Sequence, residues 1–242
     1  MMESNLSTVE VAVEAIARGG VVIVLDALDR ENEGDFLAAA ELITAETINL
    51  MITYGRGHLC QSVLPSTARR IDVQPLIASN DSTAPRFAMP VDARVCTTGI
   101  SPVDRALTIR SIVDETSGAA DFVRPGHIFP LIAEQRGVLA RQGHTEAGID
   151  LTRMAGLTPS AVLCEICSRD GRNMANLDEL RELAQKFDLP IVTIDSLVEY
   201  RRDEAEHLQI AEFVRDLAED VLTAATARAM QASSLANSGI LH

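Results

Sequence analysis

Four carboxylates and one guanidinium occupy seven consecutive positions early in the chain, from Asp29 to Asp35. Carboxylates crowded in this way repel one another, and a hard divalent cation bound through oxygen relieves that repulsion. Gly34 lets the backbone bend sharply beside them. The segment therefore indicates a metal site, although a solvated acidic turn accounts for the same residue types.

Two histidines lie next to groups that could work with them. His144 follows Gly143 at a predicted helix start, where free N–H groups and the helix dipole favour bound anions. Arg141 could add paired hydrogen bonds to a phosphate there. His127 ends the sequence Arg-Pro-Gly-His, which predicts a rigid turn, and an imidazole on such a turn suits proton transfer near neutral pH. A histidine that only stabilises the turn is an equal alternative for His127.

Glu165 lies in an apolar strand segment, where a carboxylate is costly unless it serves a site. It stands between Cys164 and Cys167, whose spacing could bind zinc or support redox chemistry. Because the sequence has no second pair of this spacing, two buried structural thiols are the simpler interpretation. Residues 97–101, Thr-Thr-Gly-Ile-Ser, could bind sugar hydroxyls or phosphate, or could simply begin a capped helix.

The composition predicts a soluble globular protein: 47% of the 242 residues are hydrophobic and 23% are charged. A net charge of −14 argues against nucleic acid or an anionic membrane as partner, since both need a basic surface. A local arginine pocket could still bind an anionic substrate. Four cysteines, with neither a secretory signal nor an apolar run long enough to span a bilayer, favour a cytoplasmic protein.

The elements that must position these groups alternate between strands and helices. Ser7 and Glu10 form a capping-box pattern that predicts a helix through about Arg18. The acidic segment then follows the carboxyl end of a predicted buried strand, an edge where ligands commonly gather. We expect strands at 21–25, 128–131, 161–166 and 191–194, helices at 47–54, 101–113, 144–155 and 177–187, and a loop-rich stretch at 64–91. The pattern predicts an α/β (α+β) fold in three layers, a mixed sheet flanked by helices, with a C-terminal helical extension.

In this order, four segments resemble the 3,4-dihydroxy-2-butanone 4-phosphate synthase family. They are Asp-Arg-Glu-Asn-Glu-Gly-Asp at 29–35, Thr-Thr-Gly-Ile-Ser at 97–101, Arg-Pro-Gly-His-Ile-Phe-Pro-Leu at 124–131 and Gly-His-Thr-Glu-Ala at 143–147. The resemblance covers roughly residues 7–200, and several independent motifs make chance agreement implausible. We therefore expect a synthase-like domain at 1–202 and a helical extension at 203–242, which would pack on the protomer or its partner.

The resemblance implies a lyase that uses Mg²⁺ (or Mn²⁺) to convert ribulose 5-phosphate into 3,4-dihydroxy-2-butanone 4-phosphate and formate. It also implies a homodimer in which the partner subunit completes each active site. Glu31 and His144 would be the metal ligands. The residues expected to be catalytic are His127, Glu165, Glu33, Asp35 and Cys60. The residues expected to hold the small phosphorylated sugar are Arg30, Glu31, Asp35, Arg141, Gln142, Gly143, His144, Thr145, Glu165, Asp26 and Thr98.

The chain departs from the family pattern in several loops. Ala27 and Leu28 replace the usual acidic residues, residues 82–87 are one residue short, a second shortening lies near Val95 and Cys96, and Tyr54 and Arg56 replace a histidine and a small residue. Two alternatives to the synthase therefore stay open. One is a paralogue that performs metal-assisted enolisation on a related sugar phosphate, and the other is a catalytically inactive homologue with a binding role.

Overall fold

The structure, a computed structural model, describes residues 6–27, 33–76 and 84–206. Its strands are β1 (Val21–Leu25), β2 (Gly34–Ala39), β3 (Cys60–Val63), β4 (Val91–Ala93), β5 (Phe122–Ile132), β6 (Ala161–Glu165) and β7 (Ile191–Thr193). Its α-helices are α1 (Val9–Ala17), α2 (Ala45–Tyr54), α3 (Pro65–Arg70), α4 (Pro102–Val113), α5 (His144–Met154) and α6 (Leu177–Phe187). Two short 3-10 helices span Ala119–Asp121 and Gly137–Leu139.

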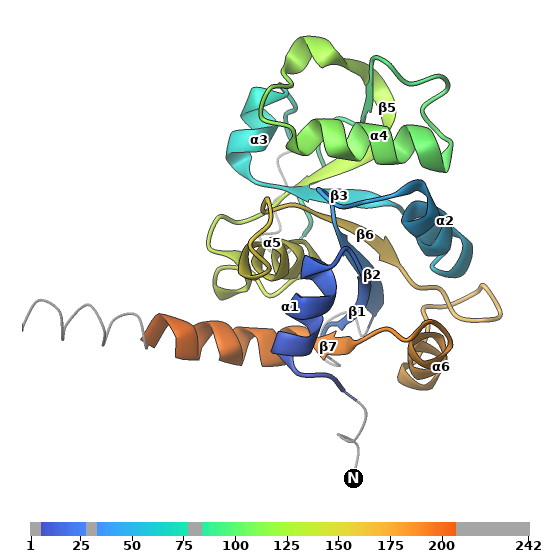
Figure 1. Cartoon of the computed structure of the whole chain (residues 1–242), viewed down its shortest axis with the longest axis vertical. Helices are drawn as coiled ribbons and strands as arrows, with labels where there is room; N and C mark the ends of the chain where they lie inside the picture. Colours follow the sequence, from blue (N-terminus) through green and yellow to red (C-terminus); the bar gives the residue numbers. More distant parts are fainter. Residues whose placement is uncertain (1–5, 28–32, 77–83, 207–242) are drawn as a thin grey trace, which may run out of the picture. The chain divides into compact units, whose positions relative to one another are not determined.

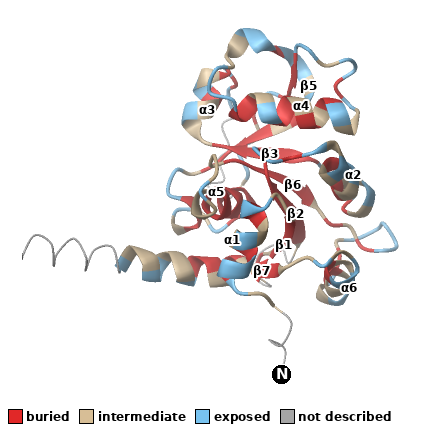
Figure 2. Cartoon of the chain, in the orientation of Figure 1, coloured by how far each residue is buried: buried red, intermediate tan, exposed pale blue. Residues whose placement is uncertain are grey.

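The strands form one mixed sheet in the order β4-β5-β3-β6-β2-β1-β7 (Figure 1). β1 runs parallel to β7, and β3 runs parallel to β5, while the other neighbouring pairs are antiparallel. The central strands β1, β2 and β6 are almost entirely buried (Figure 2). A short apolar strand buried on both faces, such as Val21–Leu25, needs helices on both sides of the sheet.

Alternation along each strand divides the core into two layers. Ile23, Phe36 and Val162 belong to a large apolar cluster with residues of α2, α4 and α6, such as Met51 and Ile109. On the opposite face, α5 packs against β1, β2, β3 and β6, and α1 packs against α5 (Figure 1). The predicted three-layer arrangement of a mixed sheet and flanking helices is confirmed.

Most of the predicted elements are found within one or two residues of their expected bounds. One expectation that was wrong concerns the cap of the first helix, because the N-cap is Thr8 rather than Ser7 and no side chain caps the turn. The physical reason is that the backbone N–H of Ser7 donates to the carbonyl of Ile191 at 2.7 Å, which ties Ser7 to β7 instead.

The segment Arg124–His127 is a second correction, because it is not a turn but part of the long strand β5. The N–H of Gly126 donates to the carbonyl of Pro90 at 3.0 Å, and the N–H of His127 donates to Asp92 at 2.9 Å. With both donors satisfied across β4, the chain stays extended past Pro125. The loop-rich stretch 64–91 was also only partly right, because Pro65 begins α3 at the helix position that proline favours.

The chain divides into two compact units, residues 1–199 and 200–242. Of the second unit the structure describes residues 200–206, which are helical. The predicted extension therefore lies largely outside the described residues. None of the helices that the structure describes is both long and apolar enough to cross a membrane.

Candidate active site

A small cavity of about 70 Å³ is lined by side chains from separate parts of the chain, most of them residues expected at the site. Seven residues expected at the site line it: Glu33, Asp35, Cys60, Arg141, His144, Thr145 and Glu165. They come from the start of β2, the start of β3, the start of α5 and the end of β6. Four apolar residues complete the lining: Pro85, Phe87, Leu131 and Leu163. Segments far apart in the sequence thus meet at one place.

Strand register brings two carboxylates of this cavity together. β2 and β6 are antiparallel, and Asp35 pairs directly with Glu165. Directly opposed residues on neighbouring strands hold their Cβ atoms roughly 5 Å apart. Asp35 is only 5% exposed. Two carboxylates this close in a largely buried place favour a bound cation or a shared proton.

Asp26 and Glu33 contact each other across the part of the acidic region that the structure does not describe. The N–H of Glu33 donates to Asp26 Oδ1 at 2.8 Å, and the N–H of Asp26 donates to the Glu33 carbonyl at 3.2 Å. Asp26 is buried but does not line the cavity. Arg30 and Glu31, the residues expected to bind substrate and metal between these two ends, lie outside the described residues.

His144, the first residue of α5, is oriented by the backbone of β1. Its Nε2 lies 3.2 Å from the carbonyl oxygen of Val24, and its Nδ1 lies 4.0 Å from Asp35 Oδ2. Because a carbonyl only accepts hydrogen bonds, Nε2 carries a proton in this contact, which leaves Nδ1 as the ring nitrogen that could bind a metal. The imidazole is almost fully buried. A backbone partner for the second nitrogen is the usual arrangement of a metal-binding histidine.

Glu165 is positioned by the turn before β3. The N–H of His58 donates to Glu165 Oε2 at 2.7 Å. Gly57 makes this approach possible, because a Cβ at that position would lie 2.6 Å from the same oxygen. The carboxylate is therefore fixed at the end of β6 by a close backbone contact that only glycine permits.

Arg141 folds over the start of α5 and contacts a buried carboxylate. Its Nη1 lies 2.6 Å from Glu146 Oε2, and Glu146 Oε1 accepts the N–H of Glu134 at 3.0 Å. The side chain of Glu146 is 2% exposed and that of Arg141 is 14% exposed. No side chain caps the first turn of α5. The guanidinium and the helix start together form a place where an anion could bind.

The thiol of Cys60 stays protonated in this environment. Burial raises its pKa far above the ordinary thiol range, and the carboxylates of Glu165 and Asp35 raise it further. Cys60 can therefore shape the cavity or donate a weak hydrogen bond, but it does not supply a thiolate near neutral pH.

Several predicted residues are not brought to this cavity. Gln142 and Thr98 are exposed, and Gly143 is buried as the N-cap of α5, outside the cavity lining. His127 lies on β5, where its side chain is 42% exposed and its Nδ1 contacts Asp92. Within one chain, His127 is thus separate from the cavity that holds the other expected catalytic groups.

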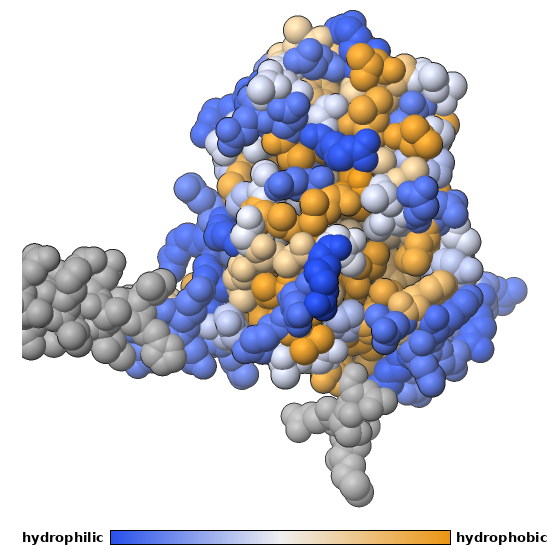
Figure 3. All heavy atoms as spheres, in the orientation of Figure 1, coloured by the Kyte–Doolittle hydropathy of each residue, from blue (hydrophilic) through white to orange (hydrophobic). Residues whose placement is uncertain are grey.

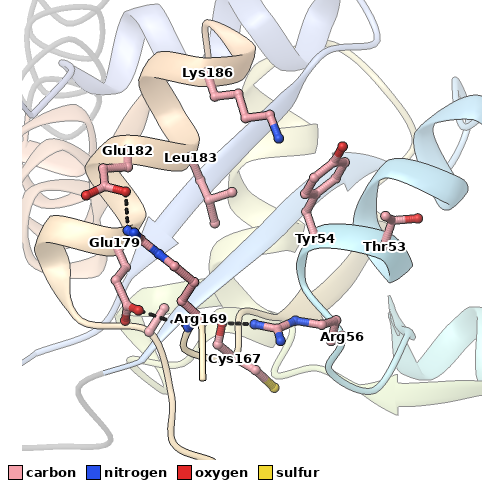
Figure 4. Close-up of a pocket in the computed structure, with 10 residues that line it drawn as sticks. Thr53, Tyr54, Arg56, Cys167, Arg169, Glu179, Glu182, Leu183 and Lys186 are labelled. Carbon is pink, nitrogen blue, oxygen red and sulfur yellow. Dashed lines mark hydrogen bonds and ion pairs between the residues drawn. The ribbon is translucent and has the colours of Figure 1, made fainter. Parts of the chain in front are cut away.

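A second cavity, of about 420 Å³, lies between α2 and α6 (Figure 4). Arg169 contacts Glu182 and Glu179 there, while Arg56 donates to the Cys167 carbonyl at 2.8 Å. Lys186 also lines this cavity, and its ammonium lies 4.3 Å from the centre of the Tyr54 ring. None of the eleven residues that line the small cavity takes part. The larger space is therefore distinct from the site that the motifs form.

Known proteins with similar sequences and structures point to one family. The sequence profile described as 3,4-dihydroxy-2-butanone 4-phosphate synthase matches residues 10–200. The riboflavin biosynthesis protein RibBA of Bacillus cereus is 49% identical over 195 residues, which are 80% of this chain and 49% of that protein. The chain belongs to the 3,4-dihydroxy-2-butanone 4-phosphate synthase family. It spans about half the length of the RibBA proteins that it matches.

Solved structures of synthases in this family share the fold. The synthase of Candida albicans is 38% identical with a TM-score of 0.76, and the comparison covers 81% of this chain and 98% of that one. A synthase in complex with two magnesium ions is 35% identical with a TM-score of 0.75, covering 81% of this chain and 96% of that one.

The donor types at the synthase site fit a divalent cation. His144 Nδ1 faces Asp35, and Glu33 lines the same cavity. Mg²⁺ needs only one or two protein carboxylates, because water and substrate oxygens complete its shell. Among the described residues no three His, Cys, Asp or Glu side chains form a group that could hold a metal by itself. Glu31, the other residue expected to bind the metal, lies outside the described residues.

Sequence reasoning missed the apolar wall of the synthase site. The rings of Phe87 and Phe129 lie near that of His58, with the His58 and Phe129 centres 4.4 Å apart. Phe87 lines the cavity, whereas His58 and Phe129 do not. Phe129 belongs to the motif at 124–131 but was given no role, and no sequence signal indicated His58. Asp92 was also missed, although a signal existed: like Glu165, it is a carboxylate in an otherwise apolar strand.

Proposed function

We propose that this chain converts D-ribulose 5-phosphate into 3,4-dihydroxy-2-butanone 4-phosphate and formate, as a lyase of riboflavin biosynthesis. The observation that carries the proposal is the convergence of seven expected site residues on one cavity of a family member. The RibBA relatives are named for riboflavin biosynthesis, which supports the pathway. Four free cysteines favour a reducing compartment such as the cytoplasm, and the charge of −14 opposes binding to nucleic acid or an anionic membrane.

Glu31 and His144 would hold the divalent cation, Mg²⁺ or Mn²⁺. Glu31 is two residues before Glu33, which lines the cavity. The lone pair on His144 Nδ1 points into the same region as Asp35. When bound, the cation would offset the negative charge that develops on the sugar oxygens after the first proton is removed.

Arg141 and the start of α5 would bind the substrate phosphate. The N-terminal turn of α5 has backbone donors and no side-chain cap, and Thr145 lines the cavity beside them. Arg141 already contacts Glu146, so its guanidinium is held in place before any substrate arrives. A fixed guanidinium loses less side-chain entropy when it binds an anion.

The carboxylates around the cavity would carry out the proton transfers of the reaction. The reaction begins with removal of a proton next to a ketone and later needs proton donors for the lost hydroxyl and for formate. Asp35 and Glu165, paired across β2 and β6, differ in their surroundings, because a backbone N–H fixes Glu165 and His144 neighbours Asp35. Either carboxylate could therefore act as the base or the acid in these transfers.

A second copy of the chain would complete the site with His127. The imidazole is partly exposed and does not line the cavity of its own chain. Apolar side chains are exposed on β5, which carries His127, and on the segment from β4 into α4, and Figure 3 shows apolar surface over this part of the chain. They are Val95, Ile100, Val103 and Val123. Such a surface next to a functional histidine suits a homodimer interface.

One observation favours a second candidate, a paralogue that acts on a related sugar phosphate. Pro85 and Phe87 belong to the segment that departs from the family pattern, and both line the cavity. Ring contacts tie Phe87 to His58, so the departure changes the wall that faces a substrate. A different wall could favour another sugar phosphate or another product.

The test is to incubate the purified protein with ribulose 5-phosphate and Mg²⁺ and to measure formate and the four-carbon phosphate. The synthase releases both in equal amounts and stops when Mg²⁺ is chelated. Glu31→Gln should lose nearly all turnover, whereas the matched change at exposed Glu115 should not. A metal-dependent change in the sugar without formate would support the paralogue, and the absence of any metal-dependent binding would support the inactive homologue.

A further inference from the structure

The larger cavity, between α2 and α6, has cationic side chains on several of its walls. Arg56, Arg169 and Lys186 line a space of about 420 Å³. In Figure 4 the Lys186 side chain enters from α6 and points toward Tyr54, while the Arg56 side chain enters from the other side of the space. Lys186 is the only lysine among the 242 residues. Positive charge therefore gathers at a second place, away from the synthase site.

The two carboxylates that line this cavity already have partners. Glu182 contacts the guanidinium of Arg169, and Glu179 accepts the backbone N–H of Arg169 at 2.9 Å. In the part of the chain that the structure describes, neither Arg56 nor Lys186 forms an ion pair with a carboxylate. Two positive charges thus face the cavity without a negative charge bound to them.

The partners that Arg56 and Lys186 do have are neutral. The guanidinium of Arg56 donates to the carbonyl of Cys167 at 2.8 Å and to that of Ser168. The ammonium of Lys186 lies over the ring of Tyr54. Hydrogen bonds between charged groups are stronger than those to neutral acceptors. An anion that enters the cavity therefore gains two charged contacts in exchange for weaker, neutral ones.

The size and the remaining walls of the cavity describe the rest of its occupant. Ala175, Leu183 and the ring of Tyr54 supply apolar surface. The volume lies within the range of sites for small organic molecules, and it exceeds what an inorganic anion needs. A phosphate monoester with an apolar group fits best, because its two negative charges match two cations and a guanidinium pairs with phosphate oxygens.

The turn that carries Arg56 also positions Glu165 at the synthase site. The carbonyl of Gly55 accepts the N–H of Cys167 at 2.9 Å, and the N–H of His58 donates to Glu165 Oε2 at 2.7 Å. Together with the bonds from Arg56, these contacts tie residues 55–58 to residues 165–168. A phosphate that draws the guanidinium away from its two carbonyls removes part of this connection and loosens the turn that holds Glu165.

We propose that the cavity between α2 and α6 is an effector site, which binds a small phosphate monoester with an apolar group and lowers turnover when it is filled. The phosphate lies between Arg56 and Lys186, and the apolar group lies against Leu183 and Ala175. The binding does not depend on the proposed function, whereas the effect on turnover rests on it.

Pyridoxal 5′-phosphate is the probe, because it carries both a phosphate and an aldehyde that reacts with lysine. The aldehyde condenses with the amine of Lys186 with loss of water, and borohydride reduces the imine to a stable adduct that mass spectrometry locates. Pyridoxal has the same ring and aldehyde without the phosphate. Each labelling rate is divided by that of Nα-acetyllysine in the same solution, which corrects for the different reactivities of the two aldehydes.

Three variants complete the comparison. Arg56→Gln removes one of the two cations, and Arg69→Gln is its matched control, because Arg69 is exposed and lines neither cavity. Lys186→Gln has no lysine to label, so it shows whether the treatment itself affects turnover. Thermal unfolding confirms that each protein is folded. Competition by inorganic phosphate in wild type tests the phosphate contact without any variant.

The corrected labelling of Lys186 should be about tenfold faster with pyridoxal 5′-phosphate than with pyridoxal, which is the effect of one charge-assisted contact. Arg56→Gln should lose this advantage, Arg69→Gln should keep it, and inorganic phosphate should slow the labelling. After excess reagent is removed, labelled wild type should release formate with a kcat at least about threefold below that before labelling. Lys186→Gln should have the same kcat before and after the same treatment.

The proposal is overturned if pyridoxal labels Lys186 as fast as its phosphate does, if inorganic phosphate leaves the labelling rate unchanged, or if folded Arg56→Gln labels like wild type. It is also overturned if fully labelled wild type keeps its kcat. A wild type that releases no formate before treatment would instead contradict the proposed function. The labelling rates would still decide whether the cavity binds a phosphate monoester.

Discussion

Replacing Arg141 should destabilise the fold, because the arginine neutralises a carboxylate that is otherwise buried. The Glu146 side chain is 2% exposed, and its carboxylate contacts Arg141 Nη1 at 2.6 Å and accepts the N–H of Glu134 at 3.0 Å. Arg141→Ala removes the charged partner and leaves the carboxylate with the backbone N–H. Breaking a buried pair in this way costs about 3–5 kcal/mol of unfolding free energy. For a chain of this size that lowers the Tm by about 6–20 °C.

Glu146→Gln should cost less, about 1–3 kcal/mol, because the amide oxygen still accepts the Glu134 N–H and no charge is left buried. The double variant Arg141→Ala/Glu146→Gln should be more stable than Arg141→Ala alone, since it buries no unpaired carboxylate. Urea unfolding of the four proteins gives the coupling free energy directly. An Arg141→Ala variant within about 1 kcal/mol of wild type, or a double variant no more stable than it, would refute the reasoning.

Other regions give three further predictions. Gly57→Ala should lower both turnover and stability, because its Cβ would lie 2.3 Å from the backbone oxygen of Glu165 and 2.6 Å from its Oε2, so that Glu165 must move; normal kcat would show that the position of this carboxylate is dispensable. Native Cys60 should resist alkylation at pH 8, since burial keeps its thiol protonated; mass spectrometry that finds it modified before unfolding would contradict this. Hydrogen bonds from Thr97 lower the pKa of Asp104 to about 2, so its contribution to stability is present above about pH 4 and is lost as pH falls toward 2. Wild type should therefore lose more stability than Asp104→Asn between about pH 4 and pH 2, and equal losses would exclude this contribution.

The sequence alone was sufficient for elements that local patterns define. The apolar run Val21–Leu25 is β1, and the periodic segment Leu177–Phe187 is α6 with the predicted bounds. Strand β2 was missed because the polar pair Gly34 and Asp35 begins it, so its short apolar run looked like the end of a loop. The prediction failed because Asp35 is a polar residue that is buried at the site, and a local sequence pattern does not show such burial.

Long-range pairing explains what the sequence could not predict about the site. The motifs named Asp35 and Glu165, but their direct pairing depends on the register of β2 and β6, two strands separated by more than 120 residues. The contact between His127 and Asp92 likewise joins residues that are 35 positions apart in the sequence. Residue types indicated which groups do chemistry, whereas only the fold showed which of them meet.

The central claim is that Glu31 and His144 bind one divalent ion, and crystals soaked with Mn²⁺ and ribulose 5-phosphate test it most directly. An anomalous difference map should show an ion within about 2.3 Å of a Glu31 oxygen and of His144 Nδ1. An ion bound elsewhere, or Glu31 and His144 far apart in every pairing of subunits, would contradict the account.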